Sequence, residues 1–282
     1  MSRIQELESK IINDFLDRTL TRNYILEKYK ISVRTLYKIL ESNNIPKRGK
    51  FRKHFFNEHY FDEINTPEKA QVLGFLYADG CVSKTGTISV NLKENDKEYL
   101  LTLLDKFKAS TSILYYIKSR IHMGPNKVLI TSAGQYGFSL CSKTLAKSCA
   151  KAGLVPRKSW ANVCFPNESI LPKELRRYFI LGILEGDGTI YVSKHTVKTN
   201  GKYINRYISW LGSLKLIEGI SDVIKEELGI NSSLIKLKSK IITKISFKSK
   251  KNVKAIINWL YSGATFCLKR KFNAAQEILS LC

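Results

Sequence analysis

Apolar residues recur along this chain with two different periods, and these periods predict where its helices and strands lie. Spacings of three and four predict helices over residues 4–16 and 24–29, and a third helix begins after the capping residue Ser32. Beyond residue 56, helices and alternating strands occur in one order over 57–165 and again over 166–282. The pattern therefore predicts a small all-α unit followed by an α+β region that consists of two similar halves.

The two halves are predicted to contain matching elements, each series following an apolar run of helical length. The first half has strands that include 88–92, a helix over 96–108, strands over 112–118 and 127–140, and a helix over 142–152. The second half has strands over 189–193 and 203–211, a helix over 217–228, strands over 233–247, and a helix over 252–261. Such a repeat suggests duplication of a symmetric dimer, so a monomer with internal pseudo-twofold symmetry is expected.

The region 233–247 alternates apolar and basic residues most clearly. One parity carries the apolar residues Ile235, Leu237, Ile241, Ile245 and Phe247, and the other carries Lys236, Lys238, Lys240, Lys244 and Lys248. Because successive side chains of a strand point to opposite faces, one face should be core and the other a row of ammonium groups. Such a row can contact phosphates, or it can protect a sheet edge against aggregation.

Two nine-residue stretches inside the apolar runs match each other. They are Val72–Gly80 and Ile180–Gly188, and both have Gly at the third position, a small residue at the seventh and Asp-Gly at the end. One copy is a common helix-end pattern. Small residues four apart, however, share one helix face and let two backbones approach closely. The strip of one helix consists of Gly74 and Ala78, and that of the other of Gly182 and Gly186. The repeat therefore predicts that the two helices pack together through these strips.

The two acids of these stretches, Asp79 and Asp187, would then lie side by side. Each would sit at the carbonyl end of a helix, where negative charge is disfavoured. Two carboxylates that close cannot both ionise without a raised pKa or a bound cation. Carboxylate oxygens beside a phosphate form the hard-oxygen site that Mg²⁺ prefers. The sequence therefore predicts a divalent-cation site between the halves.

Composition restricts the partner of the chain. Lysine and arginine number 47 against 24 aspartate and glutamate, which gives a formal net charge of +23 and a pI near 9.7. Such a chain favours a polyanion, and nucleic acid is the leading candidate. A membrane surface is the rival, but no apolar run approaches about 18 residues and no signal-peptide pattern occurs, so a soluble intracellular protein is expected. The six cysteines and four histidines lack the spacing of a zinc site or a nucleophile triad.

The paired stretches resemble the motif of the LAGLIDADG homing endonucleases, in the single-chain form that carries both copies. The resemblance implies two αββαββα halves whose sheets form a saddle over the DNA major groove, with the motif helices at their interface. It also implies that Asp79 and Asp187 bind the divalent ions, Mg²⁺ or Mn²⁺, with which the family cuts DNA. Backbone carbonyls such as those of Ala78 and Gly186 would complete the metal site.

Two features near the motifs are relevant to this resemblance. The sixth motif position departs from the family name, being Tyr77 in one copy and Glu185 in the other, but this place is variable. The family also places a basic residue in each half near the scissile phosphate, where a cation can stabilise developing charge. Basic segments follow both acids at similar distances, so Lys158 and Lys271 are assigned that role. The alternative is that both segments are ordinary basic surface.

Residues 1–46 have the pattern of a helix-turn-helix, with a plain three-helix bundle as the alternative. In the first interpretation Val33, Leu36 and Leu40 face inward, while the DNA-facing side of the recognition helix carries Arg34, Thr35 and Lys38. Residues 47–56 form a basic linker. It would follow the phosphate backbone or lie in a minor groove, or be a solvated hinge, and its basic residues are Arg48, Lys50, Arg52 and Lys53.

The predicted function is metal-dependent cleavage of both strands of double-stranded DNA at a long recognition site. Three alternatives use similar scaffolds. An intein is disfavoured because the chain lacks the Cys or Ser start and the His-Asn end that self-splicing needs. An RNA maturase would bind intron RNA and would need neither acid. A transcription regulator would bind DNA without cutting it, but such regulators tend to lose the acids, and both acids are present here.

Overall fold

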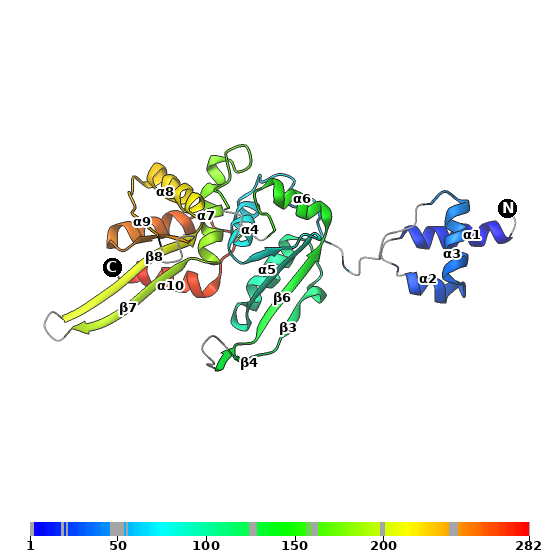
Figure 1. Cartoon of the computed structure of the whole chain (residues 1–282), viewed down its shortest axis with the longest axis horizontal. Helices are drawn as coiled ribbons and strands as arrows, with labels where there is room; N and C mark the ends of the chain where they lie inside the picture. Colours follow the sequence, from blue (N-terminus) through cyan, green and yellow to red (C-terminus); the bar gives the residue numbers. More distant parts are fainter. Residues whose placement is uncertain are drawn as a thin grey trace. The chain divides into compact units, whose positions relative to one another are not determined.

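The computed structural model describes residues 3–17, 20, 22–45, 54, 56–123, 129–156, 158, 163–197, 201–236 and 242–281. The chain forms two compact units, Met1–Phe55 and Phe56–Cys282 (Figure 1). Within the described ranges, no helix combines the length and the apolar character that a membrane crossing requires.

The first unit is built from helices around a small apolar core. Its described helices are α1 (Arg3–Leu16), α2 (Arg22–Tyr29) and α3 (Val33–Ser42). Ser32 caps α3 as predicted, because its hydroxyl accepts a 3.1 Å hydrogen bond from the backbone N–H of Thr35. Ile11, Ile25 and Leu36 belong to the core. The prediction that Val33 faces inward is wrong: it is the first residue of α3, it is 38% exposed, and it is not among the residues packed in this core.

The second unit repeats one element order, and the predicted α+β fold with two αββαββα halves is confirmed. The first half contains α4 (Pro67–Ala78), β1 (Gly80–Val82), β2 (Thr87–Lys93), α5 (Lys97–Lys106), β3 (Tyr115–Ile117), β4 (Arg120–Met123), β5 (Leu129–Ser132), β6 (Gln135–Cys141) and α6 (Lys143–Lys151). The second half contains α7 (Arg176–Glu185), β7 (Thr189–Val197), β8 (Gly201–Gly212), α8 (Leu214–Leu228), β9 (Leu234–Lys236), β10 (Thr243–Phe247), α9 (Lys250–Tyr261) and α10 (Lys269–Ser280). Short 3₁₀ turns are η1 (Glu94–Asp96), η2 (Thr111–Ile113) and η4 (Lys173–Leu175).

The two antiparallel sheets have equivalent topologies in the described residues. Their strand orders are β1-β2-β6-β3 and β7-β8-β10-β9. In each sheet the two central strands are the second and the last of that sheet in chain order, β2 with β6 and β8 with β10. Helices α5 and α6 contact the first sheet, and α8 and α9 contact the second. In β2 the buried residues alternate with exposed ones, which puts Asn91 and Lys93 on the face opposite the core. Each sheet thus has one face in the core and one face that carries polar side chains.

The first half departs from the prediction in one hairpin. The region predicted as one strand over 127–140 contains β5 and β6, and β5 pairs with β4 as a separate two-stranded sheet. The apolar side chains of Ile121, Met123 and Leu129 are between 66% and 71% exposed, so this hairpin extends beyond the core. A strand without core contacts carries no clear apolar alternation from which it could be predicted.

The region 233–247 also divides into two strands, and one predicted face is wrong. Ile235 in β9 pairs with Lys244 in β10, so these two residues share a face, and Ile235 is 50% exposed. The prediction placed Ile235 with the core residues Ile245 and Phe247. Strands β9 and β10 pair antiparallel in a register that joins odd with even positions, so parity cannot be carried from one strand to the other.

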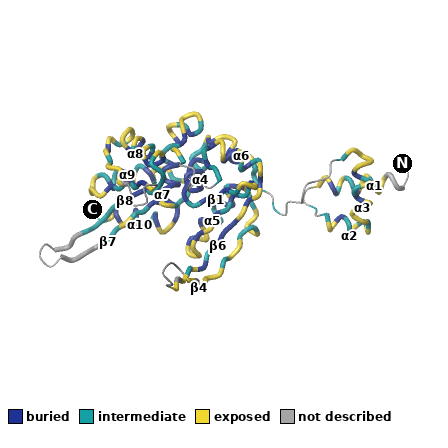
Figure 2. The backbone as a smooth tube through the Cα atoms, viewed as in Figure 1, coloured by how far each residue is buried: buried dark blue, intermediate teal, exposed yellow. Residues whose placement is uncertain are grey.

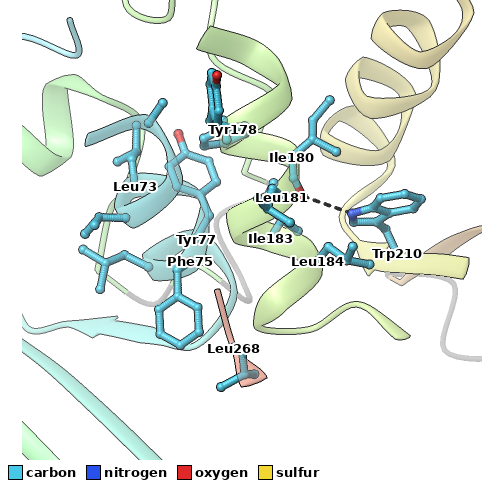
Figure 3. Close-up of a cluster of buried hydrophobic side chains, with 14 of the residues drawn as sticks. Leu73, Phe75, Tyr77, Tyr178, Ile180, Leu181, Ile183, Leu184, Trp210 and Leu268 are labelled. Atoms are coloured by element: carbon cyan, nitrogen blue, oxygen red, sulfur yellow. Dashed lines mark hydrogen bonds between the residues drawn. The ribbon is translucent and has the colours of Figure 1, made fainter. Parts of the chain in front are cut away.

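The motif helices α4 and α7 form the centre of the second unit, and both are buried along most of their length (Figure 2). A Cβ on Gly74 would lie 2.0 Å from the carbonyl oxygen of Phe179, and one on Gly182 would lie 2.1 Å from that of Gln71. The helices therefore touch backbone to backbone, as the small-residue strip predicts. Figure 3 shows apolar side chains of both helices around this contact, with the Trp210 indole N–H donating to the carbonyl of Ile180 at 3.2 Å.

Candidate active site at the ends of the motif helices

The abutting ends of α4 and α7 bring the two motif acids together. Asp79 is the C-cap residue of α4, and Asp187 follows Gly186, the C-cap of α7. A Cβ on Gly186 would lie 2.3 Å from the Cβ of Ala78 and 3.4 Å from Cγ of Asp79, so the two helix ends are in contact. Burial raises the pKa of Asp79, and the negative charge of Asp187 raises it further. The two helix ends therefore bring Asp79, which is partly buried, and the exposed Asp187 close enough to interact electrostatically.

Each helix end holds a lysine ammonium group. The Nζ of Lys158 donates to the last carbonyls of α4, at 2.9 Å to Leu76, 2.8 Å to Tyr77 and at closer range to Ala78. The Nζ of Lys271 donates to the carbonyls of Leu184, Gly186 and Gly188 at 2.6 to 2.7 Å. The last carbonyls of a helix lack intrahelical donors and carry the negative end of its dipole, so a cation is favoured there. Both lysines predicted from their spacing therefore lie at the site.

The four charged groups form a compact cluster of two acids and two bases. Burial lowers the pKa of Lys158 to about 8, and the charges of Asp187 and Asp79 oppose that shift. Burial also lowers the pKa of Lys271 to about 8, with Arg270 contributing in the same direction and Asp79 opposing it. Both lysines in turn restrain the rise in the pKa of Asp79. The cluster is therefore electrostatically coupled across the two halves.

The donor atoms fit a divalent cation in part. Two carboxylates supply oxygens of the kind that Mg²⁺ prefers. Among the residues placed by the structure, no group of three or more His, Cys, Asp and Glu side chains forms a metal cluster. The carbonyl oxygens of Ala78 and Gly186, predicted as further ligands, accept hydrogen bonds from Lys158 and Lys271. A metal at Asp79 and Asp187 would therefore need oxygens from another molecule, such as the phosphates of a nucleic acid.

A buried hydrogen-bond network around Glu185 was not predicted. Its carboxylate accepts hydrogen bonds from Gln71 Nε2 at 2.9 Å, from the Tyr99 hydroxyl at 2.7 Å and from the backbone N–H of Leu268 at 2.7 Å. Burial raises the pKa of Glu185 to about 7, against the effect of these hydrogen bonds. Gln71 also donates to the carbonyl of Phe266 at 2.8 Å. A charged residue inside an apolar run was the available signal for this network.

Two further contacts near the site were also not predicted. The hydroxyl of Tyr77, the other residue at the sixth motif position, donates to the carbonyl of Ala152 at 2.6 Å. Arg270 forms an ion pair between the halves, with Nε 3.0 Å from a carboxylate oxygen of Asp96, which is 6% exposed. These contacts tie the segments before and around the two lysines to the rest of the unit.

The residues predicted to bind DNA from 233–248 lie outside this cluster. Lys244 lies in β10 with its Nζ 5.4 Å from the centre of the Tyr207 ring, and Lys248 is exposed just after β10. The backbone of Lys236 in β9 pairs with Thr243. Lys238 and Lys240 lie outside the described residues. The described strands β9 and β10 therefore do not form the single continuous row of lysine ammonium groups that was predicted for this region.

In the first unit, Arg34, Thr35 and Lys38 are exposed on α3, as the predicted recognition surface requires. The hydroxyl of Thr35 lies within hydrogen-bond distance, 2.9 Å, of the hydroxyl of Ser32, the N-cap residue of α3. The four basic residues predicted for the linker lie outside the described residues: Arg48, Lys50, Arg52 and Lys53.

Comparison with known proteins gives structural matches alone. No family profile matches the sequence, and no curated protein matches it. The meganuclease I-SmaMI bound to uncleaveable DNA has 12% identity and a TM-score of 0.49, over 77% of this chain and 88% of that one. The LAGLIDADG meganuclease I-AabMI bound to uncleaved DNA has 12% identity and a TM-score of 0.48, over 77% and 90%. The I-LtrWI LAGLIDADG homing endonuclease bound to target DNA has 14% identity and a TM-score of 0.47, over 80% of this chain and 91% of that one.

Proposed function

We propose that this chain is a divalent-metal-dependent DNA endonuclease that cuts both strands within a long recognition site. The observation that carries the proposal is the pairing of Asp79 and Asp187 at the joined ends of α4 and α7. Asp79 is partly buried beside the charge of the exposed Asp187, and both effects raise the cost of ionising Asp79. A bound cation would offset that cost. The net charge of +23 favours a polyanion as the molecule that supplies the remaining oxygens.

The residues of the cluster have distinct proposed roles. Asp79 and Asp187 would hold Mg²⁺ or Mn²⁺ together with phosphate oxygens of the DNA, and the carbonyls of Ala78 and Gly186 could join them if the lysines move. When bound, the metal would neutralise phosphate charge and lower the pKa of an attacking water. Lys158 and Lys271 would stabilise the negative charge that develops during cleavage, since their ammonium groups lie at the same helix ends.

The pseudo-symmetry of the second unit supports cutting of both strands. One chain supplies two sheets, two acids and two lysines, so a monomer carries a complete pair of half-sites. The open faces of the sheets carry side chains suited to base edges and phosphates, such as Asn91 and Lys93 in the first half and Lys244 in the second. We therefore propose that residues 57–165 and 166–282 each recognise one half of the target.

Cleavage can be tested with the purified full-length chain and DNA in which the sequences that flank its gene are joined directly. Linear product is expected with Mg²⁺ or Mn²⁺ and should be absent when EDTA removes the ion. DNA that is bound but uncut with every divalent ion would instead support a transcription regulator. Tight binding to structured intron RNA together with no DNA cleavage would support an RNA maturase. Either result would overturn the nuclease proposal.

For the first unit we propose DNA binding through α3, with Arg34, Thr35 and Lys38 at the contact and the basic linker 47–56 extending it. Replacing Arg34 and Lys38 together with Ala is expected to lower affinity and to reduce the slope of log K against log salt by about 2, because each lost phosphate contact contributes about 0.9. Filter binding between low and moderate salt measures the slope.

The matched control for this experiment is Lys10→Ala on α1. Lys10 is exposed like Lys38 but pairs with Glu6 within its own helix at 2.9 Å. Its replacement should leave the salt slope within experimental error of wild type. If the double variant also keeps the wild-type slope, α3 does not contact DNA, and the first unit is a helical bundle with another role.

A further inference from the structure

The two residues at the sixth motif position differ in chemistry but make the same kind of contact. The Tyr77 hydroxyl donates to the carbonyl oxygen of Ala152, and the Glu185 carboxylate accepts from the backbone N–H of Leu268. Both side chains are buried, with exposures of 5% and 0%. Each therefore fixes a backbone group that comes from a later segment of its own half.

Each anchored segment leads directly to a lysine of the site. Ala152 is the C-cap residue of α6, and the chain continues from it to Lys158. Leu268 is the N-cap residue of α10, and Lys271 lies in the first turn of that helix. A lysine ammonium can donate to three carbonyls at once only if its own backbone is held at a fixed distance from them. In each half, the backbone group that is held by the sixth motif residue therefore lies a few residues before the lysine whose position must be fixed.

The local sequence of both segments fits this arrangement. Gly153 has a φ of +86°, and a Cβ at that position would lie 2.2 Å from the Tyr77 hydroxyl oxygen, so a larger residue would displace the anchor. In the second half, Gln71 donates to both Glu185 and the carbonyl of Phe266, so this segment is held on either side of Cys267. Both segments therefore have local features that accommodate or support the contact with the sixth motif residue.

We propose that Tyr77 and Glu185 are positioning residues, each of which holds the segment that delivers the lysine of its half to the end of its motif helix. The catalytic consequence rests on the proposed nuclease function, whereas the anchoring is a property of the protein alone. Tyr77 meets a carbonyl and Glu185 meets an N–H. The backbone group that the segment presents therefore decides whether a donor or an acceptor fits at this motif position.

The anchoring can be measured on the full-length chain without DNA, by acetylating lysines with an amine-reactive ester and quantifying Lys158 and Lys271 by peptide mass spectrometry. Acetylation of a buried ammonium requires local opening, so its rate reports how firmly the segment is held. Tyr77→Phe is expected to speed acetylation of Lys158 roughly fivefold, as expected for the loss of one buried hydrogen bond, without changing Lys271. Glu185→Leu should speed acetylation of Lys271 without changing Lys158. Glu185→Gln retains an acceptor for the backbone N–H of Leu268, so Lys271 should be acetylated at the wild-type rate.

Matched controls separate positioning from general loosening. Tyr99→Phe removes a hydrogen bond to the same Glu185 carboxylate without touching Leu268, and it should leave Lys271 unchanged. Tyr60→Phe removes a buried hydroxyl of the first half that has no hydrogen-bond partner among the described residues. If both lysines are acetylated faster in every variant, or if neither rate changes, the proposal is wrong. Should Glu185→Leu not fold, the milder Tyr77→Phe still decides the outcome.

The catalytic consequence has its own readout. If the chain cuts DNA, Tyr77→Phe should slow cleavage of one strand more than the other, so that nicked DNA accumulates, while DNA affinity stays near wild type. A structural defect would instead slow both strands equally. Wild-type protein that does not cut would overturn the nuclease proposal but leave the acetylation result standing. Wild-type cutting with equal slowing of both strands would overturn the positioning role instead.

Discussion

Replacing Asp79 or Asp187 with Asn is expected to reduce DNA cleavage at least about a thousandfold, which corresponds to about 4 kcal/mol of transition-state stabilisation. Asn keeps the shape of Asp but lacks the charge that holds a divalent cation. Because the two acids share one cluster, either single substitution should block both strands. Binding should be retained or become tighter, since one negative charge near the phosphates is removed. Strand-resolved cleavage and equilibrium binding on the same DNA measure both quantities.

An independent readout accompanies this substitution. Burial and the charge of Asp187 raise the pKa of Asp79, so its ionised form is disfavoured in the folded protein. Asp79→Asn should therefore raise the midpoint of thermal unfolding near neutral pH. Asp222→Asn on the exposed surface of α8 is the charge-matched control and should change neither cleavage nor stability. Cleavage at the wild-type rate by either motif variant would exclude these acids as the metal site.

The sequence predicted most of the fold because burial imposes a period on apolar residues. Helices α1, α3, α5, α6, α8 and α9 lie within a few residues of their predicted positions. Helix α10 was not predicted, and its first turn explains why. It begins with Lys269, Arg270 and Lys271, where the helix dipole disfavours positive charge, and Leu268 offers no capping side chain. The compensating contact is the carboxylate of Glu185, which is distant in sequence.

The candidate site was predicted in its residues but not in its contacts. The repeated small-residue strip fixed which helices meet and so placed Asp79 beside Asp187. The lysine positions follow from their similar spacing to the acid of each half. No local pattern shows, however, that Lys158 donates to the carbonyls of its motif helix, because that contact joins positions about 80 residues apart. The resemblance makes the sixth motif position variable, but a polar side chain that is buried in an apolar run demands a hydrogen-bond partner.

Substituting Ala for Gly74 is expected to lower the free energy of unfolding by at least about 3 kcal/mol, at the upper end of the effect of overpacking a core. The added Cβ would lie 2.0 Å from the carbonyl oxygen of Phe179 and 2.8 Å from its carbonyl carbon. These are backbone atoms of a buried helix, so no side chain can rotate away. The helices α4 and α7 would have to separate, which would also draw Asp79 away from Asp187.

Urea unfolding of the full-length protein, followed by tryptophan fluorescence, measures this loss, because Trp210 is buried and donates to Ile180 on α7. Gly212→Ala is the matched control. Its Cβ would lie 3.1 Å from Cδ2 of Leu216, the far end of a flexible side chain that can yield, so a change below about 1 kcal/mol is expected. If Gly74→Ala unfolds at the same urea concentration as wild type, the motif helices do not meet backbone to backbone. Both acids would then lose the geometry on which a shared metal depends.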